Sequence, residues 1–99
     1  MGCIIKDFLS RRVSQRAKQG ESLAGIDLRG AVLNEIDLRG INLKGANLCY
    51  SSLRGARLDG ANLKEAHLWK ADLKGASLEL ANLESADLDY ASLEGANLE

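Results

Sequence analysis

Residues 56–75 read ARLDG-ANLKE-AHLWK-ADLKG, four groups of five residues that each begin with alanine and carry leucine at the third place. The pattern extends in both directions, because leucine stands at every fifth position from Leu23 to Leu98, sixteen times without a gap. A short polar residue usually precedes each leucine, and glycine often follows it by two places. A fixed period of this kind is typical of a repeat architecture, in which each unit packs on its neighbours.

A period of five residues fits neither a straight strand nor an α-helix. Successive leucines would fall on opposite faces of a strand, and five residues of helix rotate the chain by roughly 140°. All the leucines can be buried together only if the chain turns a corner every five residues. Glycine tolerates positive φ at such a corner, and Asp, Asn or Ser can hydrogen-bond the turn backbone. The sequence therefore predicts an all-β solenoid with an interior filled by leucine and alanine.

The period alone does not fix the number of sides of each coil. The aromatic residues of the repeat region are Tyr50, Trp69 and Tyr90, and a coil of four sides and twenty residues places all three on one side. Such a coincidence arises by chance about one time in sixteen, so it favours four sides without excluding other numbers.

The repeat unit, A-(D/N)-L-X-G, resembles that of the pentapeptide-repeat proteins, which read A-(D/N)-L-X-X and are abundant in cyanobacteria. The resemblance covers residues 21–99. It implies a right-handed quadrilateral β-helix of about four coils, preceded in this chain by a cap formed from residues 1–20. The departures from the repeat are Glu21 and Ser51 at the alanine position and Val32, Arg57 and His67 at the Asp/Asn position.

Residues 4–19 interrupt the repeat and are expected to form a short helix. Ile5, Leu9 and Val13 follow an i, i+4 spacing, and Gly20 suits the end of a helix. So short a helix is marginal alone and must pack on another surface. The open first coil, in which isoleucine often replaces alanine, offers that surface, so we expect the helix to cap the tube.

Attachment to a membrane surface is an alternative role for the same segment. Apolar residues at positions 4, 5, 8 and 9 stand beside basic ones and could lie on an anionic bilayer. Gly2-Cys3 is similar to an acylated amino terminus, but Lys6 stands where N-myristoylation requires Ser or Thr. No apolar stretch has the length of a transmembrane helix or the character of a signal peptide. A cytoplasmic location is therefore expected.

The charge balance argues against nucleic acid as a partner. Thirteen basic and fourteen acidic residues among 99 give a net charge of −1, although residues 76–99 carry six acidic side chains and no basic one. Some members of the family that the chain resembles imitate DNA and inhibit DNA gyrase. That activity needs a long, strongly acidic rod, so a DNA mimic is kept only as an alternative function.

No constellation of residues indicates catalysis, a metal site or a cofactor. His67 is the only histidine, and in a four-sided coil it shares a side with Cys49, Asp87 and Asp89. These side chains would lie on the outside of a convex tube, where no pocket excludes water. One His and one Cys are also too few ligands for a zinc site, and Cys3 and Cys49 make no disulfide framework. We therefore expect a non-catalytic protein.

Two surfaces are candidates for binding a protein partner, since large exposed aromatic residues are enriched at interfaces and open coil edges invite stacking. The first is one side of the tube, where freely exposed aromatic side chains and their neighbours would stack: Tyr50, His67, Trp69, Lys70 and Tyr90. The second is the carboxy-terminal coil, where a second copy or another pentapeptide-repeat chain could stack: Glu79, Leu83, Leu88, Leu93 and Leu98. The expected function is a protein-interaction or structural module whose partner is not specified by the repeat.

Opposite charges in successive coils are expected to pair along the tube, which would add a few tenths of a kcal/mol to about 1 kcal/mol each. The predicted pairs are Arg39 with Asp59, Asp37 with Arg57, Lys64 with Glu84, and Lys74 with Glu94.

Overall fold

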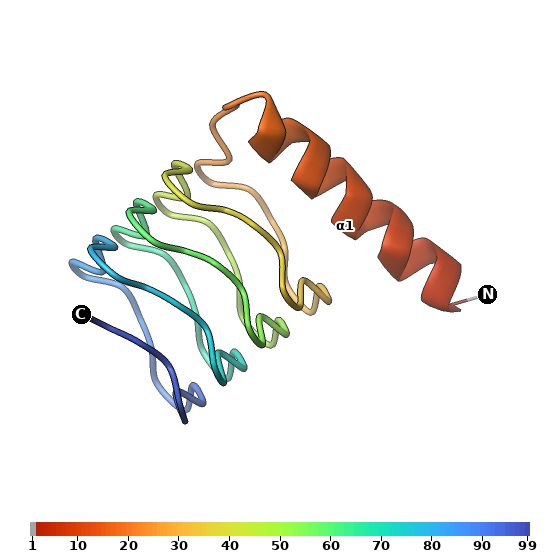
Figure 1. The fold of residues 1–99 in the computed structure, drawn as a ribbon. Coiled ribbons are helices and arrows are strands. Elements are labelled where there is room, and N and C mark those ends of the chain that lie inside the picture. The colour runs from red at the N-terminus through yellow and green to blue at the C-terminus, as the bar shows by residue number, and fades with distance from the viewer. Residues whose placement is uncertain (1) are drawn as a thin grey trace.

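The computed structural model describes the backbone of residues 2–99 and the side chains of residues 9–99. One helix, α1 (Gly2–Lys18), precedes a tube of stacked coils, and the chain turns a corner about every five residues along that tube (Figure 1). The side chains of Cys3, Ile4, Ile5, Lys6 and Phe8, on which the acylation and membrane hypotheses depend, lie outside the described residues.

Each coil of the tube contains twenty residues. Parallel β-bridges join residues twenty positions apart, such as Asp27 with Asn47 and Asn47 with His67. Backbone hydrogen bonds join the same coils, from the Leu28 N–H to the Asn47 carbonyl at 2.8 Å and from the Asn47 N–H to the Ile26 carbonyl at 2.9 Å. Twenty residues hold four pentapeptides, so the coil has the four sides that the aromatic spacing favoured.

The β-structure consists of isolated bridges throughout residues 2–99. The short period of the repeat explains why longer strands do not form. Only one residue of each side, the polar one before leucine, lies in bridge geometry before the chain bends at the next corner. The ladder between coils therefore depends on many single bridges that repeat at a fixed register.

The leucines fill the interior of the tube. Every fifth residue from Leu23 to Leu78 is leucine and is at most 2% exposed. Burying one such side chain contributes roughly 1.5–3 kcal/mol before entropy is counted, so this column is the main source of stability. Ser51, which replaces alanine, is also buried, and its hydroxyl donates to the Leu48 carbonyl at 2.7 Å. Ser51, the one buried polar side chain among residues 9–99, thus has a hydrogen-bond partner.

In most repeats, the Asp or Asn before leucine stabilises the corner that follows. Asn42 Oδ1 accepts a hydrogen bond from the Lys44 N–H at 3.0 Å, and Asn62 and Asn82 make the same contact in later coils. This is the local side-chain-to-backbone contact that Asn and Asp supply at turns. It explains why short polar residues recur at this place in the repeat.

At Ser52 and Ser77 a residue of the preceding coil stabilises the corner instead. Asn34 Oδ1 accepts hydrogen bonds from the Ser52 hydroxyl at 2.6 Å and from the Arg54 N–H at 3.0 Å. Asp59 has the same role at Ser77. These two contacts cross between coils, so they fasten the stack as well as the turn.

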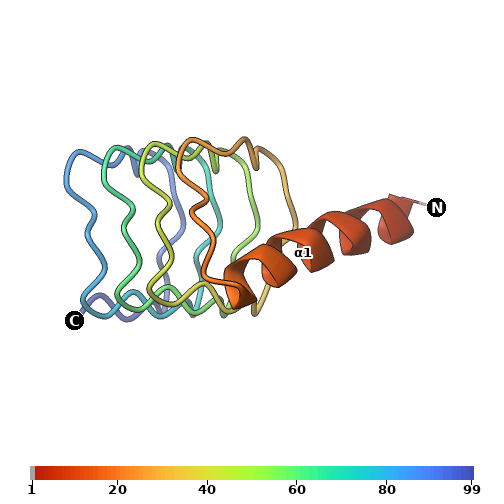
Figure 2. The ribbon, with the colours of Figure 1, turned by 90° about the horizontal axis from the view of Figure 1, so that it is seen from above.

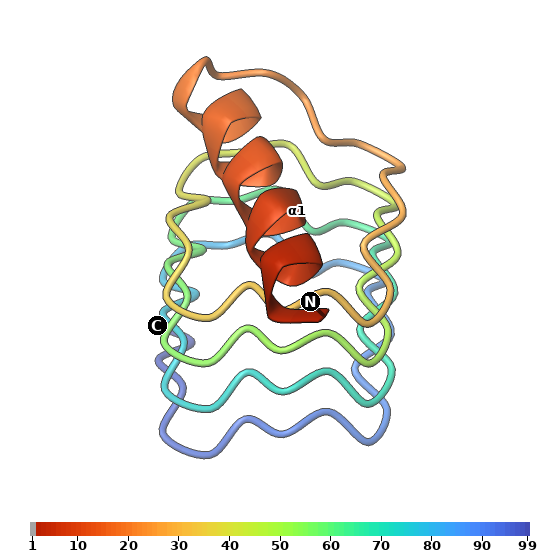
Figure 3. The ribbon, with the colours of Figure 1, turned by 90° about the vertical axis from the view of Figure 1, so that its right-hand side faces the viewer.

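Helix α1 covers one end of the tube with its carboxy-terminal half. Val13 is 2% exposed and Ala17 packs against the leucine core, whereas Leu9 is exposed. The helix crosses the opening of the first coil and diverges from it toward the amino end (Figure 2, Figure 3). It begins at Gly2, two residues before the expected start, and among its described side chains, those of residues 9–18, Val13 and Ala17 contact the core.

The junction between α1 and the first coil is closed by local hydrogen bonds. Gly20 has a φ of 71°, and its N–H donates to the Ala17 carbonyl at 2.9 Å. Arg16 Nε donates to Glu21 Oε2 at 2.9 Å, an exposed ion pair of modest strength. Neither α1 nor any other helical segment within residues 2–99 has the length and apolar character needed to span a membrane.

Candidate interaction surface

One corner of the tube carries a row of large side chains, which we call the aromatic ridge and define as Tyr50, Trp69, Lys70 and Tyr90. The ring centroids of Tyr50 and Trp69 are 5.2 Å apart with an interplanar angle of 84°. Those of Trp69 and Tyr90 are 6.0 Å apart at 86°. Both pairs are edge-to-face, an arrangement worth about 0.5–1.5 kcal/mol beyond burial. The rings come from three successive coils, so the ridge runs along the tube.

The backbone register between coils builds this ridge. The Tyr50 N–H donates to the Trp69 carbonyl at 2.9 Å, and the Lys70 N–H donates to the Asp89 carbonyl at 3.0 Å. Each bond joins a corner residue to the residue just before the corresponding corner of the next coil. Corresponding corners of successive coils therefore lie one above another. Residues twenty apart therefore project their side chains from the same edge of the tube.

Three ridge residues occupy the corner place that glycine often holds. Tyr50, Lys70 and Tyr90 have φ angles of 61°, 57° and 61°. The left-handed conformation costs a residue with a Cβ roughly 1–2 kcal/mol, whereas glycine adopts it readily. At the next corner along each of the same coils the residues are Gly55, Gly75 and Gly95. The ridge side chains are thus present against the preference of their own backbone.

Lys70 adds a cation to the ridge. Its Nζ lies 4.9 Å from the ring centroid of Trp69 and 5.9 Å from that of Tyr50, within the range of an attractive cation–π contact. Trp69 is consequently half-buried between two tyrosine rings and this lysine. The expectation of a freely exposed tryptophan is wrong, while Tyr50 and Tyr90 are 53% and 79% exposed.

The remaining polar residues of this side lie next to the ridge. His67 forms backbone bridges to Asn47 and Asp87, and its imidazole is exposed. Cys49 is a free, half-buried cysteine. Within the described part of the chain, no three His, Cys, Asp or Glu side chains are arranged to hold a metal ion. His67 therefore shares the side of the ridge without taking part in its ring contacts.

The ion pairs that join two coils of the tube are diagonal, and the expected vertical pairs make no direct contact, although Arg57 contributes to the lowered pKa of Asp37 from the next coil. Arg54 pairs with Asp72, and Lys44 Nζ lies 4.0 Å from Glu65 Oε1. Among residues 9–99, none of the four predicted pairs has its charged atoms within 4.0 Å. Long side chains lean toward a neighbouring place in the next coil, so the partner is offset from the residue directly above.

Two carboxyl groups are held in the ionised form by these pairs. Arg39 donates to both oxygens of Asp37 at 2.8 Å, and these bonds, with the Arg39 N–H, lower the pKa of Asp37 from 3.8 to about 2. Burial alone would raise the pKa of Asp72. The hydrogen bond from Arg54 and the N–H of Lys74 lower that pKa overall. Both carboxylates therefore take part in ion pairs on the outer surface of the tube.

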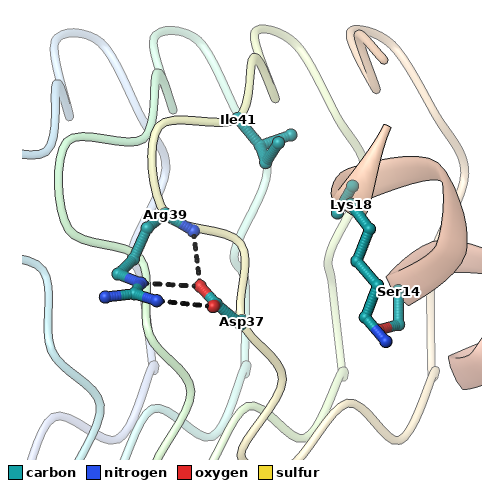
Figure 4. Close-up of a pocket in the computed structure, with 6 residues that line it drawn as sticks. Ser14, Lys18, Asp37, Arg39 and Ile41 are labelled. Carbon is teal, nitrogen blue, oxygen red and sulfur yellow. Dashed lines mark hydrogen bonds and ion pairs between the residues drawn. The ribbon is translucent and has the colours of Figure 1, made fainter. Parts of the chain in front are cut away.

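A hollow of about 360 Å³ lies between α1 and the adjoining side of the tube. Ser14 and Lys18 line it from the helix, and Asp37, Arg39 and Ile41 line it from the tube (Figure 4). Arg39 is already neutralised by Asp37, which leaves the exposed Lys18 as the other charge on its wall. One exposed lysine does not define a ligand site, so we assign no function to the hollow.

The carboxy-terminal coil is less buried than the coils before it. Leu83, Leu88 and Leu93 are half-buried, and Leu98 and Glu79 are exposed. Apolar side chains are therefore accessible at this end of the described chain. Stacking of a second copy or of another repeat chain on this coil remains a prediction.

Leu80 is an exposed residue that the sequence reasoning overlooked. Its side chain is 81% exposed, and its φ is 61°. It stands ten residues, half a coil, from Lys70 and Tyr90, and therefore at the opposite corner of the tube. A large apolar side chain at the glycine place of the repeat was the signal that could have revealed it.

Comparison with known proteins agrees with this architecture. The family model for pentapeptide repeats matches residues 26–64 and 61–99, with eight copies. The crystal structure of Rfr23, a pentapeptide-repeat protein from the cyanobacterium Cyanothece 51142, is 34% identical with a TM-score of 0.78. The match covers 81% of this chain and 55% of Rfr23. The chain belongs to the pentapeptide-repeat family.

Two further solved structures from a cyanobacterium are similar in sequence. The pentapeptide-repeat protein alr5209 from Nostoc PCC 7120 is 36% identical over 78% of this chain and 69% of its own, with a TM-score of 0.47. HetL from Nostoc sp. strain PCC 7120, a protein involved in heterocyst differentiation regulation, is 35% identical over 77% and 40%, with a TM-score of 0.46. The search of curated proteins finds no match.

Proposed function

We propose that this protein is a non-catalytic interaction module and that the aromatic ridge is the surface on which a protein partner docks. The observation that carries the proposal is the row of ring and cation contacts along one edge of the tube, because the left-handed φ of its corner residues is shared by Glu35, Glu65, Leu80 and Ser85. Tyr50, Lys70 and Tyr90 keep left-handed φ angles that glycine would adopt at lower cost. Backbone strain of this kind collects at functional sites, where the surrounding structure supports it. Exposed tyrosine and half-buried tryptophan are also the residues that dominate binding energy at interfaces.

The remaining chemistry of the tube supports binding better than catalysis. The outer side chains of residues 9–99 form hydrogen bonds to turns and diagonal ion pairs, on a convex surface. A nucleophile, a base and a water-excluding pocket would be needed for most enzymatic reactions. Cys49 and His67 lie on one side, but no described pocket encloses them. We therefore propose a role without chemical turnover and without a cofactor.

The alternative functions have less support. A DNA mimic would need a continuous acidic surface, whereas Arg39, Lys44 and Arg54 interrupt the acidic residues along the tube. A membrane-surface scaffold depends on side chains that precede Leu9. A cytoplasmic location and the right-handed sense of the coil are the remaining parts of the proposal. The first rests on the sequence, which has no apolar stretch like that of a signal peptide or a transmembrane helix, and the second rests on the resemblance to the family.

A variant with a glycine ridge tests the proposed function. The substitutions Tyr50→Gly, Lys70→Gly and Tyr90→Gly give this corner the residues that the neighbouring corner has at Gly55 and Gly75. Relief of the left-handed strain offsets the loss of ring contacts, so we expect the variant to stay folded with a melting temperature within a few degrees of the parent. Immobilised parent protein should capture a partner from a lysate of the source organism, and the variant should not.

Leu80→Gly is the matched control for this experiment. It makes the same change, an exposed large side chain to glycine at positive φ, but at the opposite corner. Capture should survive Leu80→Gly and fail in the ridge variant. The proposal is wrong if the folded ridge variant captures the same partner as the parent, or if the parent captures none.

A further inference from the structure

We propose that Tyr90, together with Asp87 and Asp89, forms a site for an arginine side chain of a protein partner. This inference rests on the proposed function, and it specifies the chemistry of the partner. The site lies at the carboxy-terminal end of the aromatic ridge. It would take the guanidinium group of a basic, extended segment, with the cation on the tyrosine ring and its N–H groups on the two carboxylates.

The contacts of Lys70 indicate that the ridge favours cations. Its ammonium group lies over the rings of both Trp69 and Tyr50, at 4.9 and 5.9 Å from their centroids. A lysine side chain is flexible and exposed here, and the surrounding solvent would accept it in other positions. The chain thus shows one cation bound by two rings of the ridge. The same lysine repels a second cation from those two rings.

Tyr90 carries the most exposed ring of the ridge. It is 79% exposed, and its ring contact is with Trp69 at 6.0 Å. The residues on either side of Leu88 are Asp87 and Asp89, and both are exposed on the side of the coil that ends at Tyr90. An exposed aromatic ring that directly follows two exposed aspartates along the chain offers an incoming cation both a ring and carboxylates.

Asp87 and Asp89 are available to a partner. Asp87 Oδ1 accepts the Asp89 N–H at 3.0 Å, which uses one of the four carboxylate oxygens. Within the described side chains of residues 9–99, neither aspartate forms an ion pair, in contrast to Asp37 and Asp72. Residues 76–99 contain no basic side chain, and in the preceding coil the ammonium group of Lys70 lies over the Trp69 and Tyr50 rings. The two charges therefore attract a cation from outside the chain.

Arginine suits this site better than lysine. Its planar guanidinium can stack on an aromatic ring and at the same time donate in two directions to carboxylates. Lysine carries a compact and strongly hydrated charge, so it gains less from a ring at an exposed position. An unselective acidic surface would instead attract both cations equally. The difference between arginine and lysine is therefore the signature of the site.

Fluorescence of Trp69, the single tryptophan, reports occupancy because its ring contacts Tyr90. The probes are acetylated tetra-arginine and tetra-lysine amides, titrated into the full chain at low ionic strength. We expect tetra-arginine to change the Trp69 emission and to bind at least about threefold more tightly than tetra-lysine. Tyr90→Gly should abolish that difference, and Tyr90→Phe should retain it.

A charge-matched pair of variants separates the site from general electrostatics. Asp87→Asn with Asp89→Asn keeps the turn hydrogen bond at residue 87 and should weaken tetra-arginine binding about tenfold or more. Glu84→Gln with Glu94→Gln removes the same charge from other sides of the tube and should weaken it less than threefold. Equal weakening by both pairs, equal binding of the two peptides, or no binding at millimolar peptide would each overturn the proposal.

These outcomes are distinct from failure of the proposed function. If a partner is captured by the parent and lost in the glycine-ridge variant while the two peptides bind equally, the ridge is an interaction surface without arginine selectivity. If neither capture nor peptide binding occurs, both proposals are wrong.

Discussion

The corner residue is the place in the repeat where stability and surface chemistry conflict. Its φ is positive at every fifth residue from Gly20 to Gly95, for glycine and non-glycine residues alike. Tyr50, Lys70 and Tyr90 form contacts with each other or with Trp69, which repays part of the cost. Leu80 has the same backbone and a largely exposed side chain. Leu80 should therefore carry the strain without the compensation.

Leu80→Gly is expected to stabilise the protein. Removing a Cβ from the left-handed region gains roughly 1–2 kcal/mol, and the greater freedom of glycine in the unfolded chain takes back about 0.4–1 kcal/mol. The net gain should raise the melting temperature by a few degrees in thermal denaturation. Gly55→Ala is the reverse control. It places a Cβ at φ 66° and 3.3 Å from Glu35 Cγ, and should lower the melting temperature. A destabilised Leu80→Gly would contradict the strain argument.

The inward direction of the leucines is tested by neighbouring substitutions. Leu63 is fully buried, so Leu63→Asp would place a carboxyl group in the interior of the tube and should cost about 3–5 kcal/mol. Lys64, the next residue, lies on the outside, and Lys64→Ala should change stability by no more than about 0.5 kcal/mol. Chemical denaturation of both variants compares them directly. Equal stability would refute the leucine interior.

At the scale of the coil, much of the structure could be predicted from the sequence. Leucine at every fifth place predicted a corner every five residues, and the spacing of Tyr50, Trp69 and Tyr90 favoured the four-sided coil. The short polar residues predicted the turn hydrogen bonds, as at Asn42 and Asn62. These features depend on backbone geometry, which the repeat specifies at each coil.

Features that depend on side-chain direction could not be predicted. Register alone placed Lys64 below Glu84, but the orientation of a long side chain decides its partner, as the diagonal pair of Arg54 and Asp72 illustrates. Trp69 was expected to be exposed because its place in the repeat faces outward. Its burial comes from neighbouring rings in other coils, which a one-dimensional pattern does not describe.

Helix α1 is an element whose role depends on a small contact. Among the described side chains of α1, those of residues 9–18, Val13 is the one that is buried among the core side chains. Val13→Asp should detach the helix and expose the first coil, since an unpaired carboxyl group is costly in an apolar contact. Hydrogen exchange should then accelerate at the amides of residues 23–31 more than at those of residues 61–71. Gln15→Asp, which adds the same charge at an exposed place, should leave exchange unchanged. If exchange in Val13→Asp did not accelerate more at residues 23–31 than at residues 61–71, the capping role would be wrong.

At the scale of the whole molecule, the tube is a one-dimensional stack in which each coil contacts only its neighbours. A corner can therefore carry different residues from the other corners without altering the interior. The ridge corner has tyrosine, lysine and tyrosine where the neighbouring corner has glycine three times. Acidic residues are concentrated in residues 76–99, the part of the tube that also contains Tyr90. This combination gives one edge of an otherwise uniform solenoid its specific surface chemistry.

The central claim is that the ridge corner is the binding surface of the tube. The most direct measurement is a nitrogen–proton correlation spectrum of the labelled chain, recorded as tetra-arginine amide is added. We predict that the largest amide shifts occur at Asp87, Asp89 and Tyr90, at the carboxy-terminal end of the ridge, while Leu80 at the opposite corner barely moves. Shifts that are largest at the opposite corner, or equal at all acidic residues of the last coils, would contradict the account.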